Sequence, residues 1–400
     1  MTKDETQADS GVTETRDELP KMGPLAVLVN PLVPTKDKFL VFSSSAQRTV
    51  TIEQRTMEGP VGITISPNHG DQFPELLAYP SSLTAMLLEN TICAFGIVGN
   101  EGHYKVALVS PAPQTAPQLT PTTPSIAGFS VNKPGAPGFE AYLYFQGVEN
   151  NEPCLREWPF RLSNFTKPSA NPIDKTLPNF LPGTKLAAAT DSRGNRWLVY
   201  QSSDGTISVY NAKTRANIRI ETTKAFVNAF KSPFLGVCVV PADKAVKRDL
   251  ARVYVYYIGS DGHVHVIFGE VSEKDQALSF AVKTKPAATF DVHAGENAVV
   301  IPEEWSQIAV VPWASRVVAD PDDAEKTVAK PCNLLFYFDG DTVTQREEPA
   351  VSGRCDECDR RRERGEAKAL VCLECLGVPK GHDVQVEVTG TFSIKVKPRL

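Results

Sequence analysis

The chain has 400 residues, and 42% of them are hydrophobic, which is enough to build a large buried core. Its 47 acidic and 42 basic residues give a formal net charge of −5, so it lacks the basic surface with which proteins bind nucleic acids. No run approaches the roughly 18 apolar residues of a membrane-spanning helix. We therefore expect neither nucleic acid nor membrane among its partners.

The first 22 residues are polar and are expected to form a disordered leader. They contain no basic start followed by an apolar segment, so no secretory signal is visible. This favours a cytoplasmic location, where cysteines stay reduced or bind metal ions.

Residues 23–350 are a succession of short apolar and aromatic runs separated by turns, which predicts an all-β domain. The chain's 31 prolines and 26 glycines also favour short strands over long helices. The runs at 24–31, 38–43 and 49–55 make a meander of a small-residue apolar strand, an aromatic strand and a more polar returning strand. Six such cycles open at Leu25, Ile92, Ile126, Lys185, Phe234 and Gln307.

Two segments show the repeated unit most clearly. Residues 196–211 read RWLVYQSSDGTISVYN, and residues 252–270 read RVYVYYIGSDGHVHVIFGE. Each is a strand, a Ser-Asp-Gly turn and a returning strand, which is typical of a β-hairpin. Because one pattern recurs along the chain, we predict a six-bladed β-propeller, with a pair of β-sandwiches as the alternative.

The strands WLVYQ at 197–201 and VYVYYI at 253–258, each followed by an Asp-Gly turn, resemble the blades of the fungal fucose-specific lectin family. Members of that family are six-bladed propellers. The resemblance implies a sugar held between blades by an Arg of the middle strand, a Glu of the returning strand and an aromatic ring. A guanidinium and a carboxylate can hydrogen-bond to sugar hydroxyls while the ring covers the apolar C–H patch.

The chain resembles a divergent member of this family, because most positions of the sugar-binding pattern differ. The positions aligned with the arginine hold Phe39, Tyr142, Trp197, Tyr254 and Leu334. The glutamate is kept at 53 and 157, whereas valines stand at 209 and 266. The candidate ligand contacts are Glu53, Glu157 and Trp158, with Tyr142, Trp197 and Tyr254 as aromatic walls.

We expect the propeller to bind a small ligand, a carbohydrate or a hydrophobic metabolite, in pockets between blades. Some lectin-like propellers of fungal biosynthetic pathways are cofactor-independent cyclases of the hetero-Diels–Alder type, so the resemblance also admits an enzyme of that kind. A pure interaction scaffold is the third hypothesis. The sequence assigns no catalytic residue, and it leaves open whether the chain is an enzyme and whether it forms a homo-oligomer.

Four cysteines near the C-terminus have the spacing C-x2-C-x13-C-x2-C, namely Cys355, Cys358, Cys372 and Cys375. Four thiolates close a tetrahedral zinc site with no open position, so we predict structural zinc and no organic cofactor. The charged linker between the two pairs has no hydrophobic core, so the metal would supply much of the local order. We expect residues 351–383 to be a zinc-binding insertion in the last blade.

Residues 384–400 alternate apolar and polar side chains over 384–388 and 392–396, which predicts a hairpin that closes the propeller ring. Single cysteines elsewhere are interpreted as small buried hydrophobes: Cys93, Cys154, Cys238 and Cys332. His263 and His265 are expected to face solvent from a blade.

Overall fold

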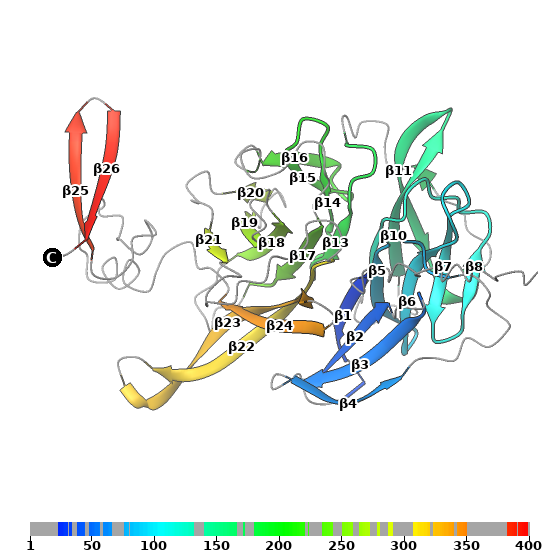
Figure 1. Cartoon of the computed structure of the whole chain (residues 1–400), viewed down its shortest axis with the longest axis horizontal. Helices are drawn as coiled ribbons and strands as arrows, with labels where there is room; N and C mark the ends of the chain where they lie inside the picture. Colours follow the sequence, from blue (N-terminus) through cyan, green and yellow to red (C-terminus); the bar gives the residue numbers. More distant parts are fainter. Residues whose placement is uncertain are drawn as a thin grey trace, which may run out of the picture.

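A computed structural model of the chain shows a series of β-sheets followed by a C-terminal hairpin (Figure 1). The described residues are 23–30, 32–33, 38–44, 48–56, 59–65, 76–79, 81–131, 140–165, 171–172, 180–220, 223, 234–242, 250–258, 264–272, 278–280, 287–290, 307–320, 323–339, 342–349, 382–389 and 391–398. The predicted leader and all four cysteines of the predicted zinc site lie outside these residues.

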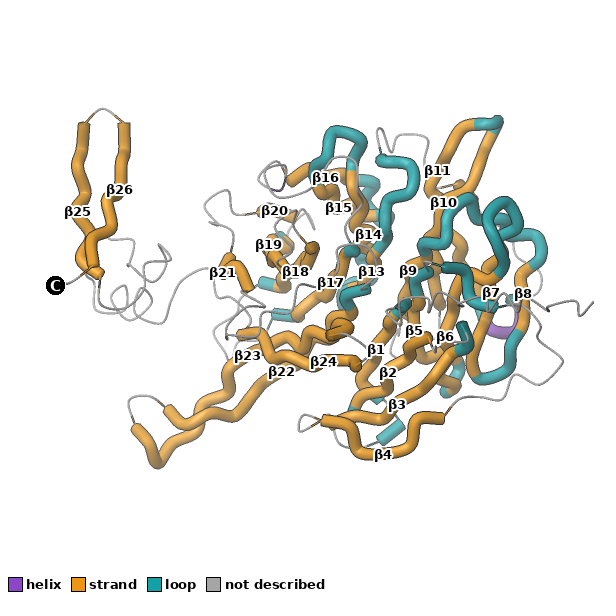
Figure 2. The backbone as a smooth tube through the Cα atoms, in the orientation of Figure 1, coloured by secondary structure: helices purple, strands orange, loops and turns teal. Residues whose placement is uncertain are grey.

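Regular structure in the described residues is β-strand apart from one turn of 3-10 helix, η1 (Leu162–Asn164), which confirms the all-β class (Figure 2). No helix in this part of the chain is long and apolar enough to cross a membrane.

Apart from the C-terminal hairpin, the described strands form six antiparallel sheets in chain order, each a meander in which consecutive strands pair. The first sheet contains β1 (Leu25–Val29), β2 (Phe39–Ser44), β3 (Val50–Thr56) and β4 (Gly59–Ile65). The second contains β5 (Leu83–Leu88), β6 (Thr91–Val98), β7 (Lys105–Ser110) and β8 (Gln114–Ala116). The third contains β9 (Ile126–Val131), β10 (Glu140–Glu149), β11 (Glu152–Phe160) and β12 (Asn171–Pro172).

The remaining sheets follow the same plan. The fourth contains β13 (Ala187–Thr190), β14 (Arg196–Gln201), β15 (Ile207–Asn211) and β16 (Ala216–Ile220). The fifth contains β17 (Leu235–Val240), β18 (Ala251–Ile258), β19 (Val264–Val271) and β20 (Leu278–Phe280), and β21 (Ala287–Phe290) also pairs with β19. The sixth contains β22 (Ala309–Asp320), β23 (Asp323–Asp339) and β24 (Thr342–Pro349).

The first strands of the six sheets lie beside one another in a ring. β1 contacts β5, β5 contacts β9, β9 contacts β13, β13 contacts β17, β17 contacts β22, and β22 returns to β1. This cyclic order is that of a six-bladed β-propeller, in which each sheet is one blade. Two sandwiches would instead group the sheets in facing pairs, so that alternative is excluded. No sheet among the described strands closes on itself, and the ring is closed by packing between the sixth and first blades.

Five of the six blade openings predicted from the sequence lie within two residues of the first strand of a blade. The second was wrong, because Ile92 lies in β6 and the blade opens at Leu83 in β5. The two strands are joined by Glu89 and Asn90, whose φ angles of 47° and 65° suit the tight turn of a hairpin.

The C-terminal strands β25 (His382–Thr389) and β26 (Thr391–Pro398) pair with each other, as the alternating pattern predicted. They form a two-stranded sheet of their own, which stands apart from the blades in Figure 1. The predicted pairing with an N-terminal strand is therefore absent from the described sheets. Contact of β22 with β1 closes the ring in its place.

Polar side chains that precede the first strands tie neighbouring blades together. The Gln307 Oε1 atom accepts hydrogen bonds from the backbone N–H groups of Leu25 (2.8 Å) and Leu83 (3.0 Å), and its Nε2 donates to the Leu83 carbonyl (3.0 Å). The Ser82 hydroxyl oxygen likewise accepts from the Ile126 N–H (2.6 Å). Gln307 thus joins the sixth blade to the first and second, where the ring closes.

Small residues allow the first strands of the blades to converge. A Cβ atom at Gly236 would lie 2.8 Å from the Val310 side chain of the next blade. At Gly128 in β9, a Cβ atom would lie 2.6 Å from the Tyr142 carbonyl oxygen of its own blade. Real Cβ atoms do not approach so closely, so each strand fits only because glycine stands there.

Candidate functional site

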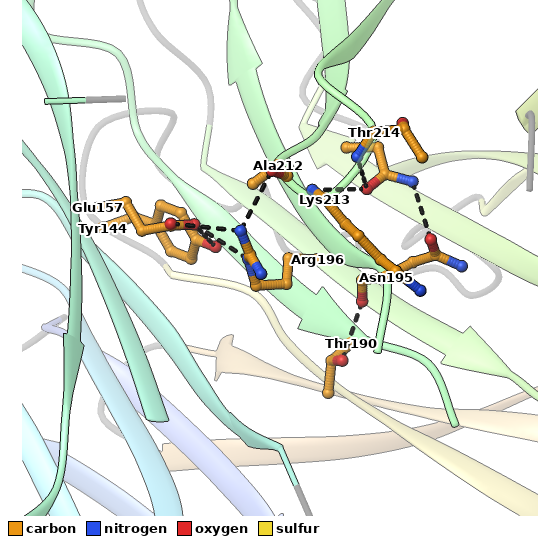
Figure 3. A network of polar contacts seen from close by, with 9 residues as sticks. Tyr144, Glu157, Thr190, Asn195, Arg196, Ala212, Lys213 and Thr214 are labelled. Atoms are coloured by element: carbon orange, nitrogen blue, oxygen red, sulfur yellow. Dashed lines mark hydrogen bonds and ion pairs between the residues drawn. The ribbon is translucent and has the colours of Figure 1, made fainter. Parts of the chain in front are cut away.

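A partly exposed group of charged and aromatic side chains lies between the third and fourth blades. Tyr144 of β10 stands directly opposite Glu157 of β11, so the two side chains share one face of the third blade. Tyr142 is two residues before Tyr144 and lies on the same face. Arg196, the first residue of β14, faces them from the fourth blade. We call Tyr142, Tyr144, Glu157 and Arg196 the Arg196 cluster, and Figure 3 labels the last three of these residues.

The Arg196 guanidinium holds the cluster together. Its Nε and Nη2 atoms lie 3.2 and 3.4 Å from the two carboxylate oxygens of Glu157, and Nη2 also donates to the Ala212 carbonyl at 3.1 Å. Its Cζ atom lies 4.6 Å from the centroid of the Tyr142 ring, a cation–π contact. The Tyr144 hydroxyl donates to Glu157 Oε2 at 2.7 Å. One carboxylate is therefore shared by a cation and a phenol at the seam between two blades.

The surroundings of Tyr144 and Arg196 favour the neutral phenol and the charged guanidinium. Burial, with the Glu157 carboxylate beside it, raises the pKa of Tyr144 well above its ordinary value. Burial, the largest single effect, lowers the pKa of Arg196, but Glu157, Tyr144 and Tyr142 together outweigh it and the net pKa is raised. The Arg196 and Glu157 side chains remain 20% and 18% exposed, so both are partly accessible to solvent.

Of the predicted ligand contacts, only Tyr142 and Glu157 come together here. Trp158 is 1% exposed and stacks on Phe160 with centroids 4.7 Å apart, because alternation along β11 turns it to the opposite face from Glu157. Glu53 lies in the first blade, where its carboxylate is 3.1 Å from Arg55 Nε.

The other two predicted aromatic walls are also buried. Trp197 is 1% exposed within the hydrophobic core that includes Val199 and Val237. Tyr254 is 1% exposed and packs against Phe268 with centroids 5.5 Å apart. Neither side chain presents a ring to solvent.

A second group of the same composition, which the sequence reasoning missed, lies on the fifth blade. Arg252 of β18 pairs with Glu270 of β19, with Nη2 and Nε 2.9 and 3.1 Å from Oε1. The guanidinium lies 5.1 Å from the centroid of the Phe268 ring. The sequence signal was an arginine at the start of an aromatic strand and a glutamate at the end of the returning strand, as in RVYVYY and IFGE.

The structure contradicts the prediction for His265 and confirms those for Cys93 and Cys238. His265 is buried and stacks on Tyr257 at 5.2 Å, so the expectation that it faces solvent was wrong, and His263 lies outside the described residues. Cys93 and Cys238 are buried as predicted, and burial raises the pKa of Cys93 to about 11. Over the described ranges, no three His, Cys, Asp or Glu side chains gather as metal ligands.

No protein-family model matches the sequence. Among curated proteins, the chain is similar to the wall-associated proteinases of Coccidioides posadasii and Coccidioides immitis. Each is 21% identical over 299 residues, which span 72% of this chain and 91% of the relative.

The similar solved structures include fungal lectins, as the sequence resemblance predicts. For AofleA from Arthrobotrys oligospora the TM-score is 0.49 with 14% identity, covering 84% of this chain and 88% of that chain. For the fucose-specific lectin from Aleuria aurantia the TM-score is 0.49 with 11% identity, covering 83% and 97%.

Proposed function

We propose that this chain is a lectin-like β-propeller that binds a carbohydrate at the Arg196 cluster. The observation that carries the proposal is the Arg196 guanidinium, which lies over the Tyr142 ring and against the Glu157 carboxylate at the seam between two blades. A cation, a carboxylate and an aromatic ring are the groups that the sequence resemblance implies for sugar binding.

The unused hydrogen-bonding capacity of the cluster suits sugar hydroxyls. Arg196 engages Nε and Nη2 with protein oxygens, whereas its Nη1 atom has no acceptor among the described residues. Glu157 Oε1 receives only the 3.4 Å contact from Nη2 within the same residues, so it can accept a further bond. Adjacent hydroxyls of a sugar ring could donate to this oxygen and accept from Nη1 together.

The burial of the predicted aromatic walls favours a carbohydrate over a hydrophobic metabolite. A pocket for an apolar ligand needs exposed aromatic surface, but Trp197 and Tyr254 are each only 1% exposed. The accessible side chains of the cluster are instead charged and paired. No described residue favours the cyclase or the scaffold hypothesis.

The curated relatives are named as proteinases, which makes peptide hydrolysis a further candidate function. Proteinases of the nucleophilic type need a serine, cysteine or threonine beside a general base. The Arg196 cluster contains a carboxylate, a guanidinium and two phenols, with the carboxylate held by the other groups. Its geometry supports binding rather than hydrolysis.

The proposal is tested with a glycan array followed by titration calorimetry of the best glycan, with fucosylated glycans as the first probes. We expect Arg196→Gln to weaken binding by about ten-fold or more, because a hydrogen bond to a charged group is lost. The Arg252→Gln variant would show whether the fifth blade supplies a second site.

The matched control is Arg219→Gln, since Arg219 pairs with Asp204 at the opposite end of the fourth blade. Arg196→Lys keeps the positive charge but removes the forked set of guanidinium donors, so it tests whether binding needs that geometry. Thermal melts of each variant verify that it is folded. A wild-type protein that binds no glycan on the array, or an Arg196→Gln protein that binds like wild type, would overturn the proposal.

A further inference from the structure

The sixth blade is one strand short of the pattern that the other five follow. Each of the first five sheets has four or more described strands, whereas the sixth consists of β22, β23 and β24. The outer strand β24 pairs with β23 on one side, and the backbone groups along its other edge have no ladder partner among the described strands. An open edge of this kind is a template for a further strand.

The C-terminal hairpin of β25 and β26 is amphipathic in its own register. Because residues alternate between the two faces of a strand, cross-strand pairs also alternate between faces. On one face every pair is apolar, and these pairs are Val384–Val396, Val386–Ile394 and Val388–Phe392. The pairs on the other face are polar, and they include Asp383–Lys397 and Gln385–Lys395. A two-stranded hairpin is marginally stable at best in water, so this one requires a partner for its apolar face.

The open edge of β24 matches the hairpin in chain order, length and reach. β25 is the strand that follows β24, and consecutive strands pair in every blade. β24, β25 and β26 each contain 8 residues. The connecting residues 350–381 can span up to about 100 Å when extended. A covalent tether raises the local concentration of a partner to the order of millimolar, which favours an edge of the same chain over one on a second copy.

The apolar core at the seam between the sixth and first blades continues to this edge. It includes Phe39 and Val41 of the first blade and Phe336 and Phe338 of the sixth, and the partly buried Val343 of β24 packs against it. Val343 stands opposite Phe338, so the two lie on the face of the sixth blade that meets the first. A strand added beyond β24 extends this face outward, where the apolar face of the hairpin can continue the core.

We propose that β25 docks antiparallel to β24 as the fourth strand of the sixth blade, with the apolar face of the hairpin turned towards the first blade. The hairpin stands apart from the blades in Figure 1, so the docked form is a second arrangement of the same chain. In the docked form the hairpin covers the seam at which β22 and β1 close the ring. β26 then becomes the outer edge, and it contains residues with which natural sheets block further pairing, Lys395, Lys397 and Pro398.

Hydrogen–deuterium exchange of the full-length chain tests whether the edge of β24 is covered. We expect peptides from 342–349 to exchange about ten-fold more slowly in wild type than in Val386→Asp, because a charge on the apolar face prevents docking. The matched control is Gln385→Asp, which places the same charge one residue away on the polar face, opposite Lys395, and should leave the exchange of β24 unchanged. Equal exchange of β24 in wild type and Val386→Asp would overturn the inference.

A photo-crosslinking measurement identifies the strand that covers the edge, and it needs no variant of the hairpin. With benzoylphenylalanine in place of Thr344 in β24, light should join β24 to peptides from 382–389. An equal mixture of ¹⁴N- and ¹⁵N-labelled chains should give cross-linked peptides that carry a single isotope, because both strands belong to one chain. Peptide pairs of mixed isotopes would show that the hairpin docks on a second copy, and the absence of hairpin cross-links would show that it does not dock on β24. Either result would overturn the inference, and neither depends on the sugar site.

Discussion

At the scale of single residues, Arg196 and Trp197 are neighbours in the sequence but lie in different environments. Arg196 contacts a carboxylate and a ring at the seam between blades, while Trp197 is buried in the core on the other face of β14. Alternation along the strand enforces this separation. A substitution at either position should therefore affect a different property, ligand binding for Arg196 and stability for Trp197.

Lys185 supplies a pH-dependent prediction at the same scale. Burial lowers its pKa to about 8, and its Nζ atom lies 4.9 Å from the centroid of the Phe234 ring on the fifth blade. Between that value and the ordinary value of 10.5, the unfolded chain binds more protons than the folded chain, so this group makes stability rise with pH. Below the window both states are protonated, and the full cost of burying the ammonium is present.

We expect Lys185→Met, which keeps the length of the side chain, to raise the melting temperature at pH 7 by a few degrees. The advantage over wild type should shrink as pH rises from about 8 through 10.5, above which the wild-type amine is neutral in both states. Melts of both proteins across this range measure the difference, which cancels the titration of other groups. A variant that is less stable at pH 7, with a gap independent of pH, would contradict the expectation.

At the scale of elements, the sequence rhythm predicted the blades well but missed β5. Its sequence LTAMLL has no β-branched side chain at its apolar positions, so it lacks the usual composition of a strand. β6, with TICAFGIV, has that composition, so the sequence pattern predicts it as the opening strand instead. Packing against β1 and β9 overrides the weak local preference of β5.

The candidate site was only half predictable for a related reason. The sequence pattern predicts Glu157 and Tyr142 as ligand contacts, but it assigns the position aligned with the arginine to Trp197, one residue after Arg196. A shift of one residue moves every side chain of a strand to the opposite face, so the error exchanged a site residue for a core residue. The partner of Arg196 comes from another blade, 39 residues earlier in the chain, and local pattern carries no signal for such a pair.

The zinc prediction also belongs to this scale, and it concerns a segment outside the described residues. Protein purified without added zinc should contain roughly one zinc ion per chain, held by the two C-x2-C pairs. Replacing Cys355 and Cys372 with serine should abolish the metal content, while Cys154→Ser should leave it unchanged, because Cys154 lies alone in β11. Elemental analysis of the three proteins measures this. A metal content near zero in wild type would remove the prediction.

At the scale of the whole molecule, ring closure depends on Gln307. One side chain satisfies three backbone groups, two N–H groups and one carbonyl, that belong to the first and second blades. Because the side chain is buried, these groups have no access to water as an alternative partner. The contact of β22 with β1 provides the surrounding packing.

We expect Gln307→Leu to lower the free energy of unfolding by about 3 kcal/mol, since buried backbone groups lose their partners. Urea denaturation followed by tryptophan fluorescence measures the change. The control is Gln114→Leu, the same substitution at an exposed position in β8, which should change stability by less than about 0.5 kcal/mol. Equal stability of the two variants would show that the glutamine does not hold the ring closed.

The position of Gln307 late in the chain also determines when the ring can close during translation. Its backbone partner Leu25 lies 282 residues earlier in the chain, so the first blade leaves the ribosome long before the residue that secures it. Until the sixth blade emerges, the first five can exist only as an open row with an uncovered blade at each end. The ring can therefore close only when the last blade has been synthesised. Until then the apolar faces of the two end blades stay exposed and can bind chaperones.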